Sequence, residues 1–194
     1  MSESTRIRAA GAYAHGGWIW TLTLWWAACC WAAGAAPDAV PEASVKAAFV
    51  YKFLSYIDWP AGTRVEGAPI TIGVLGAEQI ATELRQIAAG RTVDGHSVQV
   101  KVLTRNAPLD GVQVLFIGAA APRTQAVLAS AAVARNIVTV TENNDTTPEG
   151  SIINLVMVEG RVRFDVSLPV AQRAGVKLSS RLLSVARVVQ AEAP

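Results

Sequence analysis

The sequence predicts an α/β fold: a single domain in which a mixed sheet of about six strands is flanked by about five helices. In the first half of the domain, short apolar runs alternate with helical segments, which is the order of parallel α/β units. Near the end of the chain, two further strand-like runs flank a Glu-Gly turn at 159–160, as in a hairpin. Such a hairpin adds an antiparallel strand to an otherwise parallel sheet.

The first 35 residues have the composition of a secretory signal peptide. Two arginines precede an apolar run at residues 18–31, and small residues follow it up to Ala35, after which we predict cleavage. An uncleaved membrane anchor is the alternative, but this run is shorter than the roughly 20 residues that a spanning helix needs. Lipidation at Cys29 is a second alternative, although Trp26 stands where lipoprotein signals favour leucine.

The remaining residues, 36–194, are enough for one domain with one hydrophobic core. They include 15 basic and 14 acidic residues, a near-neutral balance that argues against nucleic-acid binding. Both cysteines of the chain lie before residue 35. The exported domain therefore has no thiol for a disulfide or for a cysteine–metal site.

Residues 42–57 carry the periodicity of an amphipathic helix. Lys46 and Lys52 lie off its apolar stripe. Pro60 disfavours a helical conformation at the residue before it and so ends the helix. That residue, Trp59, is either a packing plug, the preferred interpretation, or an exposed anchor. The expected core-facing stripe consists of Val45, Ala48, Phe49, Phe53, Tyr56 and Ile57.

The middle of the chain predicts strands and helices in turn. A buried strand at 70–75 leads through Gly76 into a helix at 77–88, without the G-x-G-x-x-G pattern of a dinucleotide site. Residues 90–103 predict a short strand, an Asp94-Gly95 turn and a longer strand with Val98, Val100 and Val102 facing inward. A strand at 112–117, a helix at 123–135 and a strand at 137–141 follow.

The last forty residues predict a hairpin and a helical end. The strand at 152–158 is almost entirely apolar, and the strand at 161–166 has a wet face made of Arg161, Arg163 and Asp165. Pro169 starts a short helix that Gly175 ends. A final helix from near Ser179 is expected to expose Arg181 and Arg187 and to bury Leu182, Leu183, Val185, Ala186 and Val189.

Catalytic constellations are missing from the sequence. His96 is the single histidine after residue 35 and is placed in a turn, and there is no G-x-S-x-G segment, so neither a hydrolase triad nor a zinc site is predicted. The carboxylates of segment 142–149 lack the spacing of a calcium loop, and we interpret it as a solvated connection. We predict no enzyme, no metal and no cofactor.

Basic residues offer a recognition surface. Arg161 and Arg163 share one strand face, and Lys177 and Arg181 follow two elements later. Together they predict a positive patch for a phosphate, a carboxylate or an acidic protein surface, with Arg161 and Lys177 as the ligand-binding pair. The alternative is a solvated sheet face on which Asp165 pairs with the arginines.

Two segments together resemble the YfiR family of bacterial periplasmic proteins: VKAAFVYKFLSYIDWP at 45–60, and GSIINL…VRFDVSL…AGVKLSSRLLSVARVV at 150–189. The resemblance implies an α/β domain, commonly a homodimer, in the periplasm. It also implies repression of a YfiN-type inner-membrane diguanylate cyclase through the periplasmic domain of that enzyme. An OmpA-like outer-membrane lipoprotein then sequesters the repressor, releasing cyclic di-GMP synthesis and biofilm formation. Family members often carry disulfides, which this domain cannot form.

Three hypotheses follow. The first is a non-enzymatic regulator whose partner-binding residues are Tyr51, Trp59, Arg163 and Arg181, because aromatic and arginine side chains most often anchor interfaces. The second is a module that binds a nucleotide or an amino acid at the carboxyl ends of the parallel strands, near Gly76 and Gly118. The third is an extracytoplasmic hydrolase that uses loop acids such as Asp145.

Overall fold

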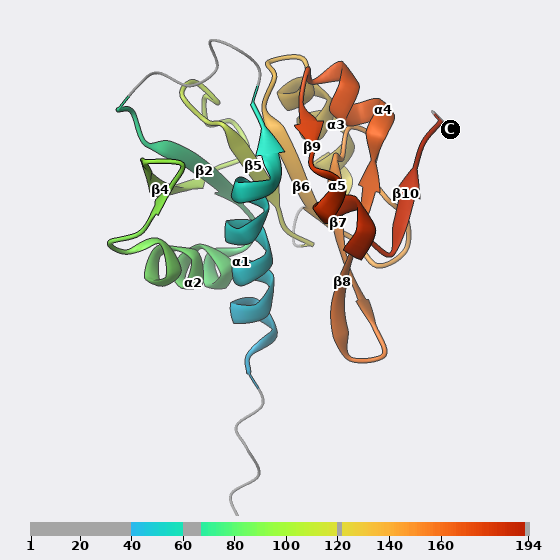
Figure 1. Ribbon diagram of the computed structural model, residues 1–194, viewed down its shortest axis with the longest axis horizontal. Coiled ribbons are helices and arrows are strands. Elements are labelled where there is room, and N and C mark those ends of the chain that lie inside the picture. Colours follow the sequence, from blue (N-terminus) through green and yellow to red (C-terminus); the bar gives the residue numbers. More distant parts are fainter. Residues whose placement is uncertain (1–39, 60–66, 120–121, 193–194) are drawn as a thin grey trace, which may run out of the picture. The chain divides into compact units, whose positions relative to one another are not determined.

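The computed structural model describes residues 40–59, 67–119 and 122–192, and the predicted signal peptide lies outside them. Within these ranges the chain has five α-helices, one short 3₁₀ turn and ten strands (Figure 1). The helices are α1 (Glu42–Phe53), α2 (Glu78–Ala88), α3 (Pro122–Val133), α4 (Leu168–Arg173) and α5 (Ser180–Val185), and the 3₁₀ turn is Leu54–Tyr56.

The ten strands form two sheets. The small sheet pairs β1 (Ile57–Asp58) antiparallel with β9 (Lys177–Leu178). The main sheet has the strand order β10-β8-β7-β6-β5-β2-β4-β3. Its strands are β2 (Ile70–Leu75), β3 (Thr92–Val93), β4 (His96–Leu103), β5 (Val114–Ile117), β6 (Val138–Glu142), β7 (Ile153–Val158), β8 (Arg161–Ser167) and β10 (Val188–Gln190).

The main sheet is mixed, as the sequence predicts. Strands β4, β2, β5, β6 and β7 run parallel, and β8 returns antiparallel to β7 through the turn at Glu159-Gly160. The predicted number of six strands is too low. The main sheet has eight strands. The strands that the sequence does not indicate at all, β1, β9 and β10, are two or three residues long, and so short a segment carries no periodicity of its own.

Helices cover both faces of the main sheet. The larger core cluster combines buried residues of α1 and α2 with one face of the strands, and a smaller cluster packs α3 against the other face. Phe164 of β8 lies beneath α1, where its ring centroid is 5.9 Å from that of Phe49 and 5.0 Å from that of Phe53. These contacts fix α1 across the hairpin half of the sheet.

Two details of the predicted α1 stripe are wrong. Ala48 is exposed, whereas Lys46 is only 5% exposed. Phe53 is buried as predicted, and the other buried apolar positions of α1 and the turn after it are Ala47, Val50 and Leu54. The physical reason is that a strict four-residue spacing drifts around a helix of 3.6 residues per turn, so the stripe at Val45 and Phe49 becomes only half-buried.

The predicted final helix is also wrong beyond its first turns. Helix α5 ends at Val185, and the chain then becomes extended and pairs as β10 with Asp165–Ser167 of β8. Val185 is 64% exposed and Val189 is 38% exposed, whereas Leu182 is buried. The unpaired outer edge of β8 explains the change, because its free backbone groups gain partners when β10 lies beside it.

Asp165 does not belong to a wet face, because it is only 5% exposed. Its carboxylate accepts hydrogen bonds from the Arg187 guanidinium, with Nε 2.7 Å from Oδ1 and Nη2 bonded to Oδ2. These hydrogen bonds raise the pKa of Arg187 above its ordinary value. Arg187 is exposed, as expected, but its guanidinium is held by Asp165, so it anchors the chain between α5 and β10.

Two smaller expectations for the middle of the sheet also change. Val102 is 45% exposed and lies outside the core clusters, whereas Val98 and Val100 of the same strand pack against the larger one. His96 is the first residue of β4 and not a turn residue, and its Nδ1 lies 2.8 Å from the Ala68 carbonyl oxygen.

Replacing Arg187 by alanine should lower the free energy of unfolding by about 1–3 kcal/mol, because the buried Asp165 carboxylate loses its charged donor. Urea unfolding followed by circular dichroism measures this loss. Arg181→Ala, an exposed arginine on α5, serves as the matched control and should change stability by less than about 0.5 kcal/mol. Equal stability of the two variants would contradict the role of Arg187.

Candidate functional site

The candidate site lies at the carboxyl ends of the parallel strands. From β2 the chain passes through α2 to β4 on one side, and from β5 it passes through α3 to β6 on the other. Neighbouring strands whose connections leave in opposite directions form a switch point, which is where open α/β sheets bind ligands. A hollow of about 470 Å³ opens here, lined by residues 76–80, Ala119, Glu142 and the first turns of α1.

Close contact between two loops forms one wall of this hollow. The Gly118 N–H donates a 2.9 Å hydrogen bond to the Leu75 carbonyl oxygen. A Cβ atom at position 118 would lie 2.7 Å from the Gly76 oxygen and 2.8 Å from Ala77 Cβ. Only glycine therefore allows the loops after β2 and β5 to meet, and both predicted glycines, Gly76 and Gly118, lie at the site.

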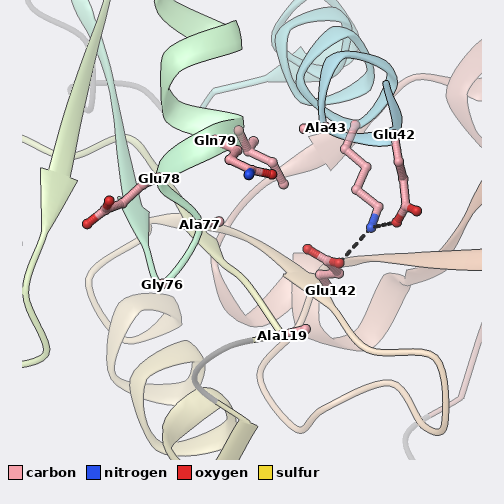
Figure 2. Close-up of a pocket in the computed structure, with 10 residues that line it drawn as sticks. Glu42, Ala43, Gly76, Ala77, Glu78, Gln79, Ala119 and Glu142 are labelled. Carbon is pink, nitrogen blue, oxygen red and sulfur yellow. Dashed lines mark hydrogen bonds and ion pairs between the residues drawn. The ribbon is translucent and has the colours of Figure 1, made fainter. Parts of the chain in front are cut away.

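A buried ammonium group ties α1 to the end of β6. Lys46 Nζ donates a 2.6 Å hydrogen bond to Glu142 Oε1 and a second hydrogen bond to Glu42 Oε1, one helical turn earlier (Figure 2). Burial alone lowers the pKa of Lys46 by favouring the neutral amine, but the hydrogen bonds and charges of the two carboxylates together outweigh it and raise that pKa. Lys46 is thus a fixed cation and not a nucleophile.

A chain of buried polar groups supports Glu142 from behind. The Gln125 side chain is 1% exposed, and its Nε2 donates to the carbonyl oxygens of Glu142 at 3.0 Å and Gly118 at 3.2 Å. Asn143 Nδ2 donates to Gln125 Oε1 at 3.3 Å, and Asn154 Nδ2 donates to the Asn143 carbonyl oxygen at 2.8 Å. The ends of β5, β6 and β7 are therefore held in a fixed relation.

The chain of polar groups continues into the sheet. Thr141 Oγ1 donates to Asn154 Oδ1 at 2.8 Å and lies 2.7 Å from Ser151 Oγ. Thr139 Oγ1 donates to the Gly150 carbonyl oxygen at 2.6 Å and accepts from the Ile152 N–H at 2.9 Å. Thr139, Thr141, Ser151 and Asn154 are each at most 1% exposed, so these bonds satisfy groups that would otherwise destabilise the core.

The chemistry of the hollow is that of a polar binding site. Gln79 and Glu142 extend toward the same space, whereas the Glu78 carboxylate points away from the Lys46 ion pairs (Figure 2). Glu142 is thus part of a buried ion pair and not of a solvated loop or a calcium loop. Among the described residues, no three His, Cys, Asp or Glu side chains gather as a metal site requires.

The structure separates the six residues that the sequence selected for binding. Arg163 is exposed and alternates with Phe164, so it projects from the face of β8 opposite to α1, as does Arg161 beside the hairpin turn. Tyr51 lies half-buried on α1 against the main core cluster. Arg181 is exposed on α5, whose Leu182 packs into that same cluster.

Trp59 and Lys177 lie in a different region. Lys177 of β9 pairs in register with Asp58 of β1, the residue before Trp59. Trp59 is partly buried against the core and lines a second hollow of about 510 Å³ beside residues 109–113 and 135–137. Figure 1 shows β9 in the upper part of the domain and the β7–β8 turn in its lower part. The roles of Arg161 and Lys177 stay predictions.

Sequence reasoning missed Lys46, Glu142 and Gln125. One signal was present: Glu42 and Lys46 have the i, i+4 spacing of a helical ion pair. Nothing in the sequence indicates that Glu142, which is 96 residues away, completes the pair. Gln125 looks like an ordinary residue of an alanine-rich helix.

The fold and the site define a class: a single α/β domain with a polar hollow at its switch point. No helix in the described ranges is long and apolar enough to cross a membrane. The chain belongs to the YfiR/HmsC-like family, whose model matches residues 43–187, and this is a family of diguanylate cyclase regulators. No curated protein matches the sequence.

Replacing Lys46 by methionine should lower the free energy of unfolding at pH 7 by about 3 kcal/mol, because Glu142 is left charged and largely buried. Because the folded state raises the pKa of Lys46, its stabilisation is complete below the ordinary value of 10.5 and is lost as the pH rises through the folded-state pKa. The difference between wild type and variant should therefore shrink above pH 10.5.

Urea unfolding between pH 7 and pH 11.5 measures this difference. The matched control is Lys52→Met, an exposed lysine on the same helix, which should change stability little over the whole range. If wild type and Lys46→Met have the same free energy of unfolding at pH 7, Lys46 does not stabilise the fold as a buried cation. A difference between them that grows above pH 10.5 would contradict the same role.

Proposed function

We propose that this protein is a non-enzymatic periplasmic regulator that represses an inner-membrane diguanylate cyclase by binding the periplasmic domain of that enzyme. The observation that carries the proposal is the family match, which spans residues 43–187 and hence α1 through α5. In this proposal the regulator lowers cyclic di-GMP and biofilm formation. An OmpA-like outer-membrane lipoprotein is proposed to remove it from the cyclase.

The arrangement of charged groups supports binding in preference to catalysis. The one buried lysine is held as a cation by Glu42 and Glu142, so it is not available as a base or nucleophile. By contrast, Arg161 and Arg163 are exposed side by side on one face of β8. Exposed arginines bind carboxylates of a partner through two parallel hydrogen bonds, which gives an interface orientation as well as affinity.

The proposed interface residues remain Tyr51, Trp59, Arg163 and Arg181. Because these residues lie on more than one face of the domain, a single flat partner surface does not contact all of them. We therefore propose two contact regions, one around Arg163 on β8 and the other around Trp59 after β1. Two contact regions fit a regulator that binds two partners, a cyclase and a lipoprotein.

Deleting the gene in a strain that has the cognate membrane cyclase should raise cellular cyclic di-GMP, because repression is lost. Wild type supplied in trans should reverse the rise, and Arg163→Glu should reverse it only partly because it repels an acidic partner surface. Mass spectrometry of nucleotide extracts measures the level.

Arg105→Glu makes the same charge change at another exposed position and should reverse the rise completely. An unchanged cyclic di-GMP level in the deletion strain would overturn the regulatory role. Complete reversal by Arg163→Glu would remove only this residue from the interface.

A second candidate function is small-molecule binding, favoured by the hollow at the ends of β2, β5 and β6. Binding there should raise the melting temperature in a screen of nucleotides and amino acids, since a ligand of the folded state stabilises it by mass action. Gln79→Ala should abolish the shift, because Gln79 points into the hollow (Figure 2). Gln99→Ala, on the exposed side of β4, is the control and should retain it. A shift that survives Gln79→Ala would place the ligand elsewhere.

A further inference from the structure

A third hollow, of about 680 Å³, lies beside the start of β7 and shares no lining residue with the two hollows described above. Segment 146–151, which leads into β7, forms one side of it. Ser167 at the end of β8, Gln190 at the end of β10 and Arg173 of α4 line the rest. Its volume is in the range of about 300–1,000 Å³ that is typical of small-molecule sites. We call it the β8–β10 hollow.

The wall formed by segment 146–151 is held in place by the rest of the domain. Gly150 packs so closely on α3 that a Cβ atom there would lie 2.4 Å from a backbone nitrogen of that helix. Its carbonyl oxygen accepts a 2.6 Å hydrogen bond from Thr139 Oγ1. The Ser151 N–H donates to the Pro148 carbonyl oxygen at 3.1 Å, which closes a turn around Glu149. A wall fixed in this way loses little conformational entropy when a ligand binds.

Ser167 brings a buried hydroxyl group without a partner to this hollow. The residue is only 2% exposed, and its N–H donates a 2.9 Å hydrogen bond to the Ile152 carbonyl oxygen. Its hydroxyl neither caps α4 nor forms any other hydrogen bond within the described part of the chain. Gln190 pairs in register with Ser167, so both side chains point to the same face of the sheet. Because buried polar groups are nearly always hydrogen-bonded, the Ser167 hydroxyl marks a position for a polar ligand group.

Two opposite charges at the same hollow are also without partners. Arg173 and Glu149 are exposed, and among the described residues neither forms an ion pair with the other or with a third residue. At the switch-point hollow, by contrast, Lys46 and Glu142 neutralise each other. Arginine offers a forked pair of donors that fits a carboxylate, whereas an ionised glutamate only accepts hydrogen bonds. The β8–β10 hollow therefore offers a donor to an anionic group and an acceptor to hydroxyl or ammonium groups.

The remaining lining excludes two other classes of ligand. No aromatic side chain is among the described residues that line the hollow, and its apolar part consists of Pro169 and Val170 beside Gly150. Nucleobases and aromatic rings bind largely by stacking on flat side chains, which this lining does not provide. A phosphate group carries nearly two negative charges at pH 7, so Glu149 repels it more strongly than it repels a carboxylate.

We propose that the β8–β10 hollow binds a small aliphatic organic acid that also carries hydroxyl or ammonium groups. The carboxylate of this ligand binds the Arg173 guanidinium, and its hydroxyl or ammonium group donates to the Glu149 carboxylate. The same ligand provides the missing hydrogen-bond partners of Ser167 and Gln190. Hydroxy acids and aliphatic amino acids share this chemistry, and the test distinguishes them. The site is separate from the contact regions and from the switch-point hollow, so it does not rest on the proposed function.

Isothermal titration calorimetry of the full chain tests the ligand class with two sets of probes. The hydroxy acids are glycolate and D-gluconate, and the amino acids are glycine and L-serine. At least one set should bind with a dissociation constant below about 1 mM. Propionate has the carboxylate without a donor group, and D-glucitol has hydroxyl groups without a carboxylate. Each should bind about tenfold more weakly, because a hydrogen bond to a charged side chain is lost.

Substitutions at the hollow test the site with the best-binding probe. Arg173→Leu should weaken binding about tenfold, because the carboxylate loses its charged donor. Arg105→Leu removes an exposed arginine elsewhere and should leave binding unchanged. Glu149→Gln, a second exposed position, should weaken binding about fivefold. Ser167→Ala should also weaken binding about fivefold but leave the melting temperature of the free protein unchanged, since its hydroxyl makes no hydrogen bond there. Gln79→Ala should have no effect, which separates this site from the switch-point hollow.

The outcomes decide between two ligand sources and can also reject the site. Binding of the hydroxy acids alone or of the amino acids alone supports the proposal and identifies the class. No binding below about 1 mM by either set overturns the proposal. Affinity that Arg173→Leu and Glu149→Gln both leave unchanged overturns it as well, as does equally tight binding of propionate. None of these measurements depends on cyclic di-GMP, so failure of this proposal and failure of the regulatory function are distinguishable.

Discussion

The requirement to neutralise one buried ammonium group organises the site end of this domain. Lys46 is only 5% exposed, and a charge so far from water destabilises the fold unless it is paired and hydrogen-bonded. Glu142 at the end of β6 and Glu42 within α1 provide the pairing. The first turns of α1 are thereby held over the carboxyl ends of the strands, where the hollow opens. Without this ion cluster, hydrophobic packing alone would hold α1 in place.

The sheet beneath that cluster is stiffened by polar groups and not only by apolar packing. Gln125 connects the carbonyl oxygens at the ends of β5 and β6, and Asn154 connects β7 to Asn143 and Thr141. Since almost no water reaches these groups, each hydrogen bond has a specific direction, and the ends of three strands take a single arrangement.

The two outer edges of the main sheet are covered to different extents. At the hairpin end, β10 and the Arg187–Asp165 ion pair cover one part of β8, and exposed arginines protect the rest. At the other end, β4 presents alternating valines with a single lysine among them. Edge strands that lack charge, proline and cover are the ones that associate. The two outer edges of the sheet therefore differ in cover and in charge.

The sequence alone determined the α/β class, the order of the central strands and helices, and the hairpin at Glu159-Gly160, because these depend on periodicity and turn residues within short windows. The family was likewise visible in two local motifs. The sequence also indicated that Gly76 and Gly118 mark strand ends, and the structure places Gly118 directly against Gly76, which lines the hollow. Only the tertiary structure decided that Lys46 is buried, that Asp165 binds Arg187, and that the chain after α5 becomes a strand. These features depend on partners 96 and 22 residues away or on the open edge of β8, and no local pattern encodes contacts over such separations.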